Sequence, residues 1–319
     1  MWLGVGGTGK GAALGPIVRP TMQARTAYLA AEGFVEPLRE ELGEVLAEYG
    51  RLLVAPGGPR AAAWAQNVWL DTREIAVPSI GQAAKALRAI QRSWALYPHL
   101  HHRRAALIAG ELPKVAAKPL VFGTPAPASP LGSWTLLAPD RMLLSPACSS
   151  AFPNGECAFV EDREGPPSRA YLKLWEALTL AGAMPEPGQR CVDLGASPGG
   201  WSWVLAKLGA TVLAVDKAPL DPKIAAMPGV AWRQASAFGL DPVDIGPVDW
   251  LFSDVICYPA RLLELVQRWQ ALGLAKRIVC TLKFQGPTDH ETARRFAAIP
   301  GSRLLHLHHN KHELCWMSF

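Results

Sequence analysis

The chain has 319 residues, of which 50% are hydrophobic and 18% charged, and its formal net charge is +5. This length favours about two domains, and the slight positive charge permits an acidic partner such as a nucleic acid without requiring one. No apolar run reaches the ~20 residues of a transmembrane helix, and the start does not resemble a secretion signal. Six scattered cysteines without a C-x-x-C pair indicate a reducing compartment. We therefore expect a cytoplasmic protein that does not enter a membrane.

Residues 1–22 are rich in glycine, and Gly4, Gly9 and Lys10 match the spacing of a phosphate-binding loop. Such a loop also needs a strand before it and a Ser or Thr after the lysine. Here only three residues precede Gly4, and another glycine follows Lys10. We therefore expect a disordered leader over residues 1–22, with Met22 as an alternative start.

The next segments combine helical and extended patterns. Apolar residues at helical spacing predict a helix over residues 33–50. Short apolar runs then predict strands over 51–55 and 63–70, and a second helical pattern predicts a helix over 79–96. The mixture indicates a small α+β unit.

The rest of the first half carries two further features. Residues 97–104, Tyr-Pro-His-Leu-His-His-Arg-Arg, are either a solvated turn or a contact with RNA phosphates, and the turn is favoured because short basic runs are common on surfaces. Residues 116–167 are dense in Pro and Gly, and their apolar runs at 134–138 and 142–144 predict a strand hairpin followed by a linker. We place the domain boundary near residue 165, between an α+β region at 23–165 and a second domain at 166–319.

From Ser168 onward the chain alternates short helices and strands, which is typical of a doubly wound α/β sheet. The predicted helices cover residues 169–181, 201–208, 259–272 and 288–299. The predicted strands cover residues 190–194, 211–215, 230–233, 250–253, 277–282, 303–307 and 314–319. If the last two segments form a hairpin over 308–311, the final strand is antiparallel to its neighbour.

The first strand of this sheet leads into a glycine-rich turn. The run Cys191-Val-Asp-Leu-Gly-Ala-Ser-Pro-Gly-Gly-Trp201 contains Asp193, and Asp216 follows 23 residues later at the end of the next strand. A carboxylate there can accept hydrogen bonds from both hydroxyls of a ribose. The dinucleotide fingerprint G-x-G-x-x-G is absent, and Pro198 removes an amide that a pyrophosphate would use. A nucleoside that carries a cationic sulfonium fits this loop better than a dinucleotide.

The run from Asp193 to Trp201 resembles motif I of the FtsJ-type 2'-O-ribose methyltransferases, and residues 167–177, Pro-Ser-Arg-Ala-Tyr-Leu-Lys-Leu-Trp-Glu-Ala, resemble the helix that carries the first catalytic lysine of that family. The resemblance is close over 168–319 and weak over 23–160. It implies a Rossmann-like class I methyltransferase sheet with a C-terminal antiparallel strand. It also implies a smaller α+β RNA-binding region of ferredoxin-like or THUMP type before that sheet, S-adenosyl-L-methionine as cofactor and RNA, ribosomal RNA in particular, as partner. We expect a monomer.

The resemblance further implies a catalytic tetrad of Lys173, Asp254, Lys283 and Glu313. The residues themselves favour this grouping, because the last residues of parallel strands share one edge of a sheet and the first residue of an antiparallel strand lies at that edge too. We expect Lys283, with its pKa lowered by burial and by the charge of Lys173, to accept the proton of a 2'-hydroxyl or to hydrogen-bond the developing alkoxide. The carboxylates are expected to orient the two lysines.

The residues expected to bind the cofactor lie in the motif turn, in the segment before its helix and at the following strand ends. They are Ser168, Asp193, Gly195, Ser197, Pro198, Gly199, Gly200, Trp201, Asp216, Ser236 and Asp254. Ser236 stands where the family usually has an aspartate that binds adenine, so a weaker hydrogen bond and a lower cofactor affinity are expected. Residues 255–259, Val-Ile-Cys-Tyr-Pro, lack the polar run usual in the family, so substrate contacts are expected to differ there.

Two alternatives to this enzyme remain. A non-catalytic RNA-binding or ribosome-assembly protein that retains the fold would be compatible with Ser236 and with the modest charge, but it would not need two lysines whose burial costs desolvation energy. A methyltransferase of small molecules or proteins would not need Lys173 and Glu313 together. No metal is expected, because the histidines at 306, 308, 309 and 312 with Cys315 give no recognisable tetrahedral set. They are interpreted as a basic turn near the RNA.

Overall fold

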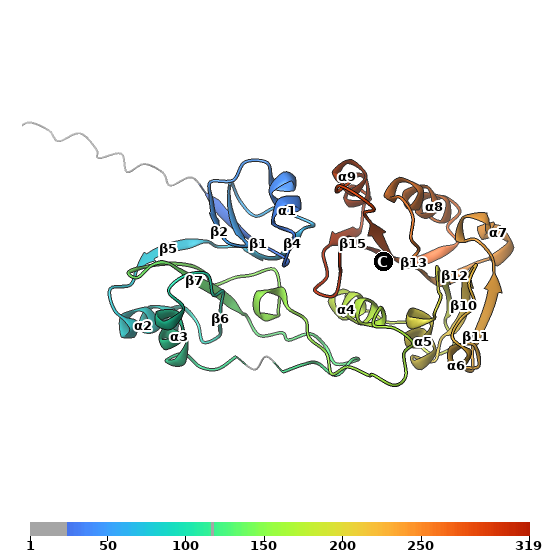
Figure 1. Ribbon diagram of the computed structural model, residues 1–319, viewed down its shortest axis with the longest axis horizontal. Coiled ribbons are helices and arrows are strands. Elements are labelled where there is room, and N and C mark those ends of the chain that lie inside the picture. The colour runs from blue at the N-terminus through green and yellow to red at the C-terminus, as the bar shows by residue number, and fades with distance from the viewer. Residues whose placement is uncertain (1–23, 116–117) are drawn as a thin grey trace, which may run out of the picture.

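The computed structural model describes residues 24–115 and 118–319. The predicted leader and its phosphate-loop spacing lie outside these residues. Figure 1 shows the elements up to residue 145 on one side of the molecule and the elements after residue 170 on the other, with a long connection between them. Within the described ranges, we find no helix with the length and apolar character needed to cross a membrane.

The first half contains two separate sheets. One has the order β2-β3-β1-β4, is antiparallel throughout and carries helix α1 (Val35–Leu42). The other has the order β5-β8-β7-β6 and carries α2 (Ile80–Ile90) and α3 (His102–Gly110). The strands are β1 (Arg25–Ala30), β2 (Ala47–Tyr49), β3 (Leu52–Pro56), β4 (Ala65–Trp69), β5 (Arg73–Ala76), β6 (Trp94–Leu96), β7 (Gly132–Ala138) and β8 (Arg141–Ser145). The first sheet follows the β-α-β-β-α-β order of a ferredoxin-like unit, except that residues 57–64 form no second helix.

Several predictions for this half were wrong. The helix predicted over 33–50 ends at Leu42, because Gly43 has φ 75° and residues 47–49 pair with β3 instead. The helix predicted over 79–96 ends at Ile90, and Trp94–Leu96 form a strand beside β7. In both cases strand pairing outweighs a local helical pattern, across a short turn in the first case and with a segment almost forty residues away in the second. Strand β1 was not predicted, and residues 102–104 begin helix α3 rather than a turn.

The second half forms one seven-stranded sheet with the order β11-β10-β9-β12-β13-β15-β14, in which β15 alone is antiparallel to its neighbours. The strands are β9 (Arg190–Leu194), β10 (Thr211–Asp216), β11 (Val230–Gln234), β12 (Val248–Ser253), β13 (Ala275–Lys283), β14 (Ser302–Leu305) and β15 (Glu313–Ser318). The predicted strands, the final hairpin and its antiparallel strand are confirmed. The α/β class with a mostly parallel central sheet is therefore confirmed as well.

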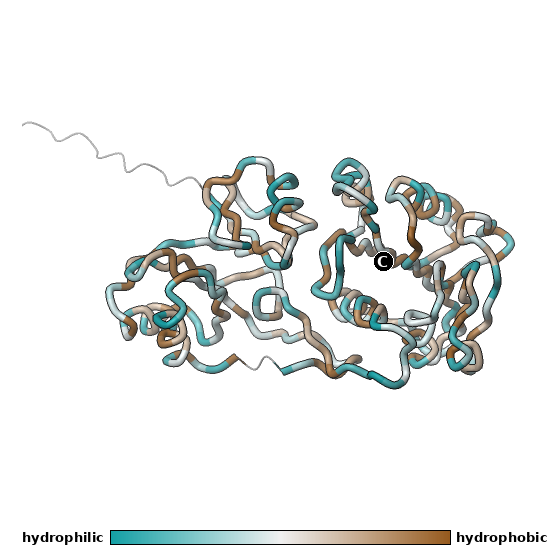
Figure 2. Tube along the Cα trace, viewed as in Figure 1, coloured by the Kyte–Doolittle hydropathy of each residue, from teal (hydrophilic) through white to brown (hydrophobic). Residues whose placement is uncertain are grey.

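Helices cover both faces of this sheet (Figure 1). The helices are α4 (Tyr171–Ala181), α5 (Gly200–Lys207), α6 (Pro222–Ala225), α7 (Pro242–Ile245), α8 (Pro259–Ala271) and α9 (His290–Ala297), and short 3-10 turns lie at Pro153–Gly155 and Ala237–Gly239. Helices α4 and α5 pack on one face, and α8 and α9 pack on the other. Figure 2 shows α9 as largely hydrophilic, because its outer positions carry charged residues while Phe296 is buried against Trp316. The sheet is thus buried on both faces, as a parallel sheet requires.

The unit built on the first antiparallel sheet contacts the second half through Phe34, Ala63 and Trp64, which lie outside its strands. Trp64, which is fully buried, stacks on Phe34 at 5.3 Å between ring centroids, and the ring of His306 lies 5.3 Å from Trp64. The backbone N–H of His306 donates to the carbonyl of Ala63 at 2.7 Å. The segment between β14 and β15 is therefore held by residues from both halves. The position of the domain boundary near residue 165 stays a prediction.

Candidate active site

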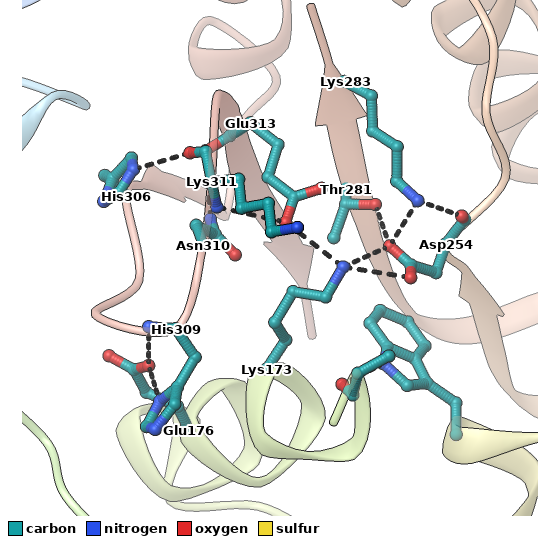
Figure 3. A network of polar contacts seen from close by, with 12 residues as sticks. Lys173, Glu176, Asp254, Thr281, Lys283, His306, His309, Asn310, Lys311 and Glu313 are labelled. Atoms are coloured by element: carbon teal, nitrogen blue, oxygen red, sulfur yellow. Dashed lines mark hydrogen bonds and ion pairs between the residues drawn. The ribbon is translucent and has the colours of Figure 1, made fainter. Parts of the chain in front are cut away.

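Four ionisable side chains from four different elements meet at the carboxyl edge of the sheet (Figure 3). Lys173 Nζ on α4 lies 2.9 Å from Asp254 Oδ1 and 3.1 Å from Glu313 Oε1. Lys283 Nζ lies 3.0 Å from Asp254 Oδ1 and donates to the carbonyl oxygen of Asp254 at 2.6 Å. The structure thus brings together all four residues of the predicted tetrad.

Strand register explains why these side chains converge. Asp254 directly follows β12, which is parallel to β13, and Lys283 ends β13. Lys283 is paired with Glu313, the first residue of the antiparallel strand β15. Lys173 reaches the same edge from α4, which packs against the sheet. The tetrad therefore depends on the neighbouring positions of β12, β13 and β15.

The charges in this cluster stabilise one another. Burial lowers the pKa of Lys173, but the carboxylates of Asp254 and Glu313 outweigh burial and raise that pKa above its ordinary value. Burial raises the pKa of Asp254, but Lys173 and Lys283 outweigh it and hold the pKa below its ordinary value. Lys173 is therefore protonated and Asp254 ionised near neutral pH. Lys173 is a permanent cation of the site and not a proton acceptor.

Two supporting residues were missed from the sequence. Thr281 Oγ1 donates to Asp254 Oδ1 at 2.6 Å, and it lies two positions before Lys283 on β13, so period-two alternation could have identified it. Glu176, three residues after Lys173 on α4, is 2% exposed. Its carboxylate accepts hydrogen bonds from the backbone N–H groups of His308 and His309 at 2.8 and 3.0 Å. Residues three apart share one face of a helix, so the spacing from Lys173 could have identified Glu176 from the sequence.

Glu176 fixes the loop that leads into Glu313. His309 Nδ1 lies 2.8 Å from Glu176 Oε2, so the same carboxylate holds both the backbone and a side chain of this loop. Asn310 then donates from Nδ2 to the carbonyl of Glu313 at 3.1 Å. Helix α4 therefore supplies Lys173 and also anchors the loop before Glu313.

A cavity of about 860 Å³ opens onto the tetrad. Lys173, Lys283 and Glu313 line it, and so does Lys311 from the loop between β14 and β15. Phe159, from the connection between the two halves, also lines it. We call it the tetrad cavity. The lysines of three different elements suit a substrate with many negative charges. The ionisable groups between them can take part in proton transfer from a hydroxyl of that substrate.

A second cavity, of about 230 Å³, lies at the ends of β9, β10 and β11. Gly195, Asp216 and Ser236, which follow or end these three strands, all line it. We call it the nucleoside cavity. Arg261 from α8 lines it as well, and its guanidinium carbon lies 4.0 Å from the centroid of the Phe238 ring. Three of the predicted binding residues thus share one cavity.

The glycine-rich turn is shaped by close backbone contacts. Gly195 has φ 76°, and a Cβ there would lie 2.7 Å from the Cα of Val255. Gly199 has φ 114°, and a Cβ there would lie 2.8 Å from Ile224 Cγ2. A side chain at either position would be strained by its backbone and by its neighbours. The turn therefore requires glycine at both positions and is held against the loop after β12.

Carboxylates at the ends of β9 and β10 order this turn. Asp216 accepts hydrogen bonds from the backbone N–H groups of Ser197 at 3.0 Å and Ala218 at 2.9 Å. Asp193 is fully buried and accepts a hydrogen bond from Ser202 Oγ at 2.7 Å. Burial raises the pKa of Asp193 to about 7. Its Oδ1 has no hydrogen-bond partner among the described residues, so it can still accept one.

The remaining predicted binding residues surround the turn without lining the nucleoside cavity. Ser168 lines the tetrad cavity, and its Oγ lies 3.0 Å from where a Cβ of Gly200 would be. Trp201 is 3% exposed, and its Nε1 donates to the carbonyl of Ala170 at 2.9 Å, so its indole belongs to the core. Pro198 lies within the turn, where its carbonyl accepts from the N–H of Asp221. The roles expected for these residues in cofactor binding stay predictions.

The histidine-rich segment is part of the packing between the halves. His306 is 4% exposed, its Nε2 lies 3.0 Å from the carbonyl of Lys311, and burial lowers its pKa to about 4. His312 Nε2 lies 3.0 Å from Thr288 Oγ1. Within residues 24–115 and 118–319, no three His, Cys, Asp or Glu side chains are grouped as metal ligands would be. His306 was expected in a basic turn near the RNA and is instead a buried contact.

The second half of the chain is similar to a known family of proteins. Residues 166–283 match the family described as FtsJ-like methyltransferase. "Ribosomal RNA large subunit methyltransferase M" from Halorhodospira halophila is 40% identical over 132 residues, which are 40% of this chain and 38% of the relative. The protein of the same name from Aromatoleum aromaticum is 35% identical over 163 residues, 46% of this chain and 44% of the relative. The chain thus matches less than half the length of these relatives.

Among solved structures, a fibrillarin pre-rRNA processing protein from Methanococcus jannaschii aligns with 46% of this chain and 73% of its own length. Its identity to this chain is 18% and the TM-score is 0.35, values too low to support a conclusion about fold or activity. The sequence relatives are far closer than this structural one. The match to the FtsJ-like methyltransferase family thus lies in the half of the chain that holds the seven-stranded sheet and the glycine-rich turn.

Proposed function

We propose that the protein is an S-adenosyl-L-methionine-dependent RNA methyltransferase that modifies a ribose 2'-hydroxyl, with ribosomal RNA of the large subunit as its substrate. The observation that carries this proposal is the cluster of Lys173, Asp254, Lys283 and Glu313 in a cavity beside the nucleoside cavity. The names of the curated relatives support the choice of substrate.

The residues of the nucleoside cavity fit the proposed cofactor. Each oxygen of Asp216 accepts one backbone N–H group and retains a lone pair, so the carboxylate can also accept two ribose hydroxyls. Ser236 offers a hydroxyl to adenine. The buried oxygens Asp193 Oδ1 and Ser168 Oγ have no partner among the described residues and suit the ammonium group of an amino-acid tail. When bound, the cofactor supplies a methyl group on a sulfonium, which an oxygen nucleophile can take.

In this mechanism Lys283 accepts the proton that the nucleophilic hydroxyl loses. A ribose 2'-hydroxyl must lose its proton as its oxygen bonds to the methyl group. Lys283, which lines the tetrad cavity where that oxygen would lie, first releases one of its own protons to solvent and then takes up the hydroxyl proton as an uncharged amine. Lys173 is bound between two carboxylates and is kept charged. It therefore supplies a fixed positive field beside the developing alkoxide, while Asp254 orients both lysines. Most of the rate comes from aligning the oxygen, the methyl group and the leaving sulfur.

A labelling experiment tests this proposal. The full chain is incubated with cofactor carrying a tritiated methyl group and with total RNA that lacks the modification. Label is expected in RNA that sediments with the large-subunit ribosomal species. Label in protein or in small molecules would instead support a different methyltransferase. Binding of S-adenosylhomocysteine and RNA without any transfer would support the non-catalytic alternative.

A further inference from the structure

Two exposed apolar side chains follow Asp254 of the tetrad within four residues. Among the described residues, Ile256 at 74% and Tyr258 at 69% are the most exposed of the large hydrophobic side chains. They are two positions apart in the loop between Asp254 and helix α8. Single exposed apolar residues are common, but here the two most exposed ones lie in one short loop that follows a tetrad residue.

The backbone holds these two side chains outward. Val255 packs against Gly195 so closely that a Cβ on the glycine would lie 2.7 Å from the Cα of Val255. Cys257 is 8% exposed and belongs to the core, and Pro259 is buried at the start of α8. Alternate residues of the loop are therefore fixed inward, which leaves Ile256 and Tyr258 facing solvent. The exposure of these two side chains is therefore set by the packing of their neighbours.

Ile256 also marks the place where the two cavities meet. It lines the nucleoside cavity and it lines the tetrad cavity. No other residue in the described part of the chain lines both. A methyl group that passes from a cofactor in one cavity to a hydroxyl in the other must pass beside Ile256. Whatever nucleotide offers its 2'-oxygen there has its base, attached to the neighbouring ribose carbon, within reach of this loop.

The chemistry of the surroundings indicates what this apolar pair contacts. Lys311 and Arg169 line the tetrad cavity in addition to the two lysines of the tetrad, which are paired with the tetrad carboxylates. Ile256 and Tyr258 follow Asp254 at the same strand edge. Cations that track a phosphate backbone, combined with side chains on which bases stack, are the features of single-stranded nucleic-acid sites. RNA-binding proteins commonly recognise unpaired nucleotides by stacking their bases on aromatic rings.

We propose that Ile256 and Tyr258 form a stacking platform for unpaired RNA bases, with Ile256 against the nucleotide whose ribose enters the tetrad cavity and Tyr258 against a neighbouring base. This inference rests on the proposed function and adds the requirement that the target nucleotide be unpaired. It assigns a role to the segment 255–259, whose apolar character departs from the polar run usual in the family.

The platform can be tested by binding alone, without catalysis. The probe is a single-stranded 12-nucleotide RNA that contains one 2-aminopurine, whose fluorescence is quenched on stacking, with the protein saturated with S-adenosylhomocysteine. Tyr258→Ala is expected to weaken binding about tenfold, since one base–aromatic contact is lost, and to abolish the quenching. Tyr258→Phe keeps the ring and is expected to restore both. Ile256→Ala is expected to weaken binding about threefold, because its aliphatic contact is smaller.

Matched variants separate stacking from charge and from folding. Leu272→Ala removes an apolar side chain that is 45% exposed at the opposite end of α8, and it is expected to bind like the wild type. Lys311→Ala is expected to lower the slope of log affinity against log salt by about 1, whereas Tyr258→Ala leaves that slope unchanged.

Each contrary outcome has a distinct meaning. If Tyr258→Ala binds like Leu272→Ala while Lys311→Ala weakens binding, the platform is overturned and the proposed function stands. The platform is also overturned if Tyr258→Phe does not restore binding, because the hydroxyl of Tyr258 and not its ring would then contact the RNA. A wild-type dimer in sedimentation that Tyr258→Ala dissociates would assign the patch to a second copy and overturn the inference. If the wild-type protein does not bind the RNA at all, both the platform and an RNA substrate are contradicted.

Discussion

The nucleoside cavity and the tetrad cavity are built in different ways, although they share one edge of the sheet. The first is formed by residues that directly follow or end three adjacent strands, Gly195, Asp216 and Ser236. The second needs side chains from helix α4, strand β13 and the loop before β15. A short motif is therefore sufficient to shape the first cavity, whereas the second depends on strand order and register across the whole sheet. Substitutions should consequently separate binding from transfer.

Lys283→Ala should have the largest effect and should act on the tetrad cavity alone. The rate of methyl transfer is expected to fall about a hundredfold to ten-thousandfold, which is the usual contribution of a positioned proton acceptor. The affinity for S-adenosylhomocysteine, measured by calorimetry, is expected to stay unchanged. Lys276→Ala is the matched control, because Lys276 lies near the other end of β13 with its side chain 70% exposed. Equal rates in the two variants would remove Lys283 from the mechanism.

The next largest effect is a loss of folding stability at low pH. It arises from the buried ring of His306, which holds the loop between β14 and β15 beside the tetrad cavity. Burial lowers the pKa of His306 from its ordinary value of 6.5 to about 4. The folded protein therefore favours the neutral ring, so stability is complete above pH 6.5 and is lost as the pH falls toward 4. The loss is expected to reach about 3 kcal/mol.

Urea unfolding between pH 7 and pH 4 measures this loss. His306→Gln cannot titrate, so its unfolding free energy should fall less steeply over that range than that of the wild type. The charge-matched control is His102→Gln, because His102 lies outside this contact and is exposed. Identical pH dependence in wild type and His306→Gln would contradict the role of the buried ring.

Asp216→Ala should affect the nucleoside cavity alone. The affinity for S-adenosylhomocysteine is expected to fall by about 2 kcal/mol, because hydrogen bonds from a ribose to a charged group are lost. The variant should still transfer methyl groups at near the wild-type rate once the cofactor is saturating. A rate that stays low at saturation would show that the two cavities are not separable in this way.

Ser236→Asp should produce the smallest change and sharpen the comparison further. A carboxylate accepts a stronger hydrogen bond than a neutral hydroxyl, so cofactor affinity is expected to rise by about 1 kcal/mol. Ser236→Ala should lower the affinity by a similar amount. Calorimetry with S-adenosylhomocysteine measures both, and a loss of affinity in Ser236→Asp would mean that Ser236 does not contact the base.

The sequence predicted the second half of the fold well because its signals are local. Strand β9 was predicted at residues 190–194 and lies there, since an apolar run ends at a glycine-rich turn. The convergence of Lys283 and Glu313 was predicted because parallel strands share an edge, and their pairing across β13 and β15 agrees with it. Thr281 and Glu176 were missed, because their contacts depend on which strand and loop lie opposite them.

The first half was harder to predict because some of its strands have only three residues and lie within segments whose pattern is helical. Residues 47–49 look helical in isolation, but they form a strand because β3 offers an unpaired edge. The contact of Trp64 with His306 joins residues 242 positions apart, and no pattern within either segment indicates it.

The most direct test of the account is the chemical position of the transferred methyl group. RNA labelled by the protein is digested to nucleosides, and the labelled nucleosides are separated by chromatography and mass spectrometry. Label is expected on a 2'-O-methylated nucleoside, and at least about a hundredfold less of it is expected with Lys283→Ala. Label on a base, or equal 2'-O-methylation by Lys283→Ala, would contradict it.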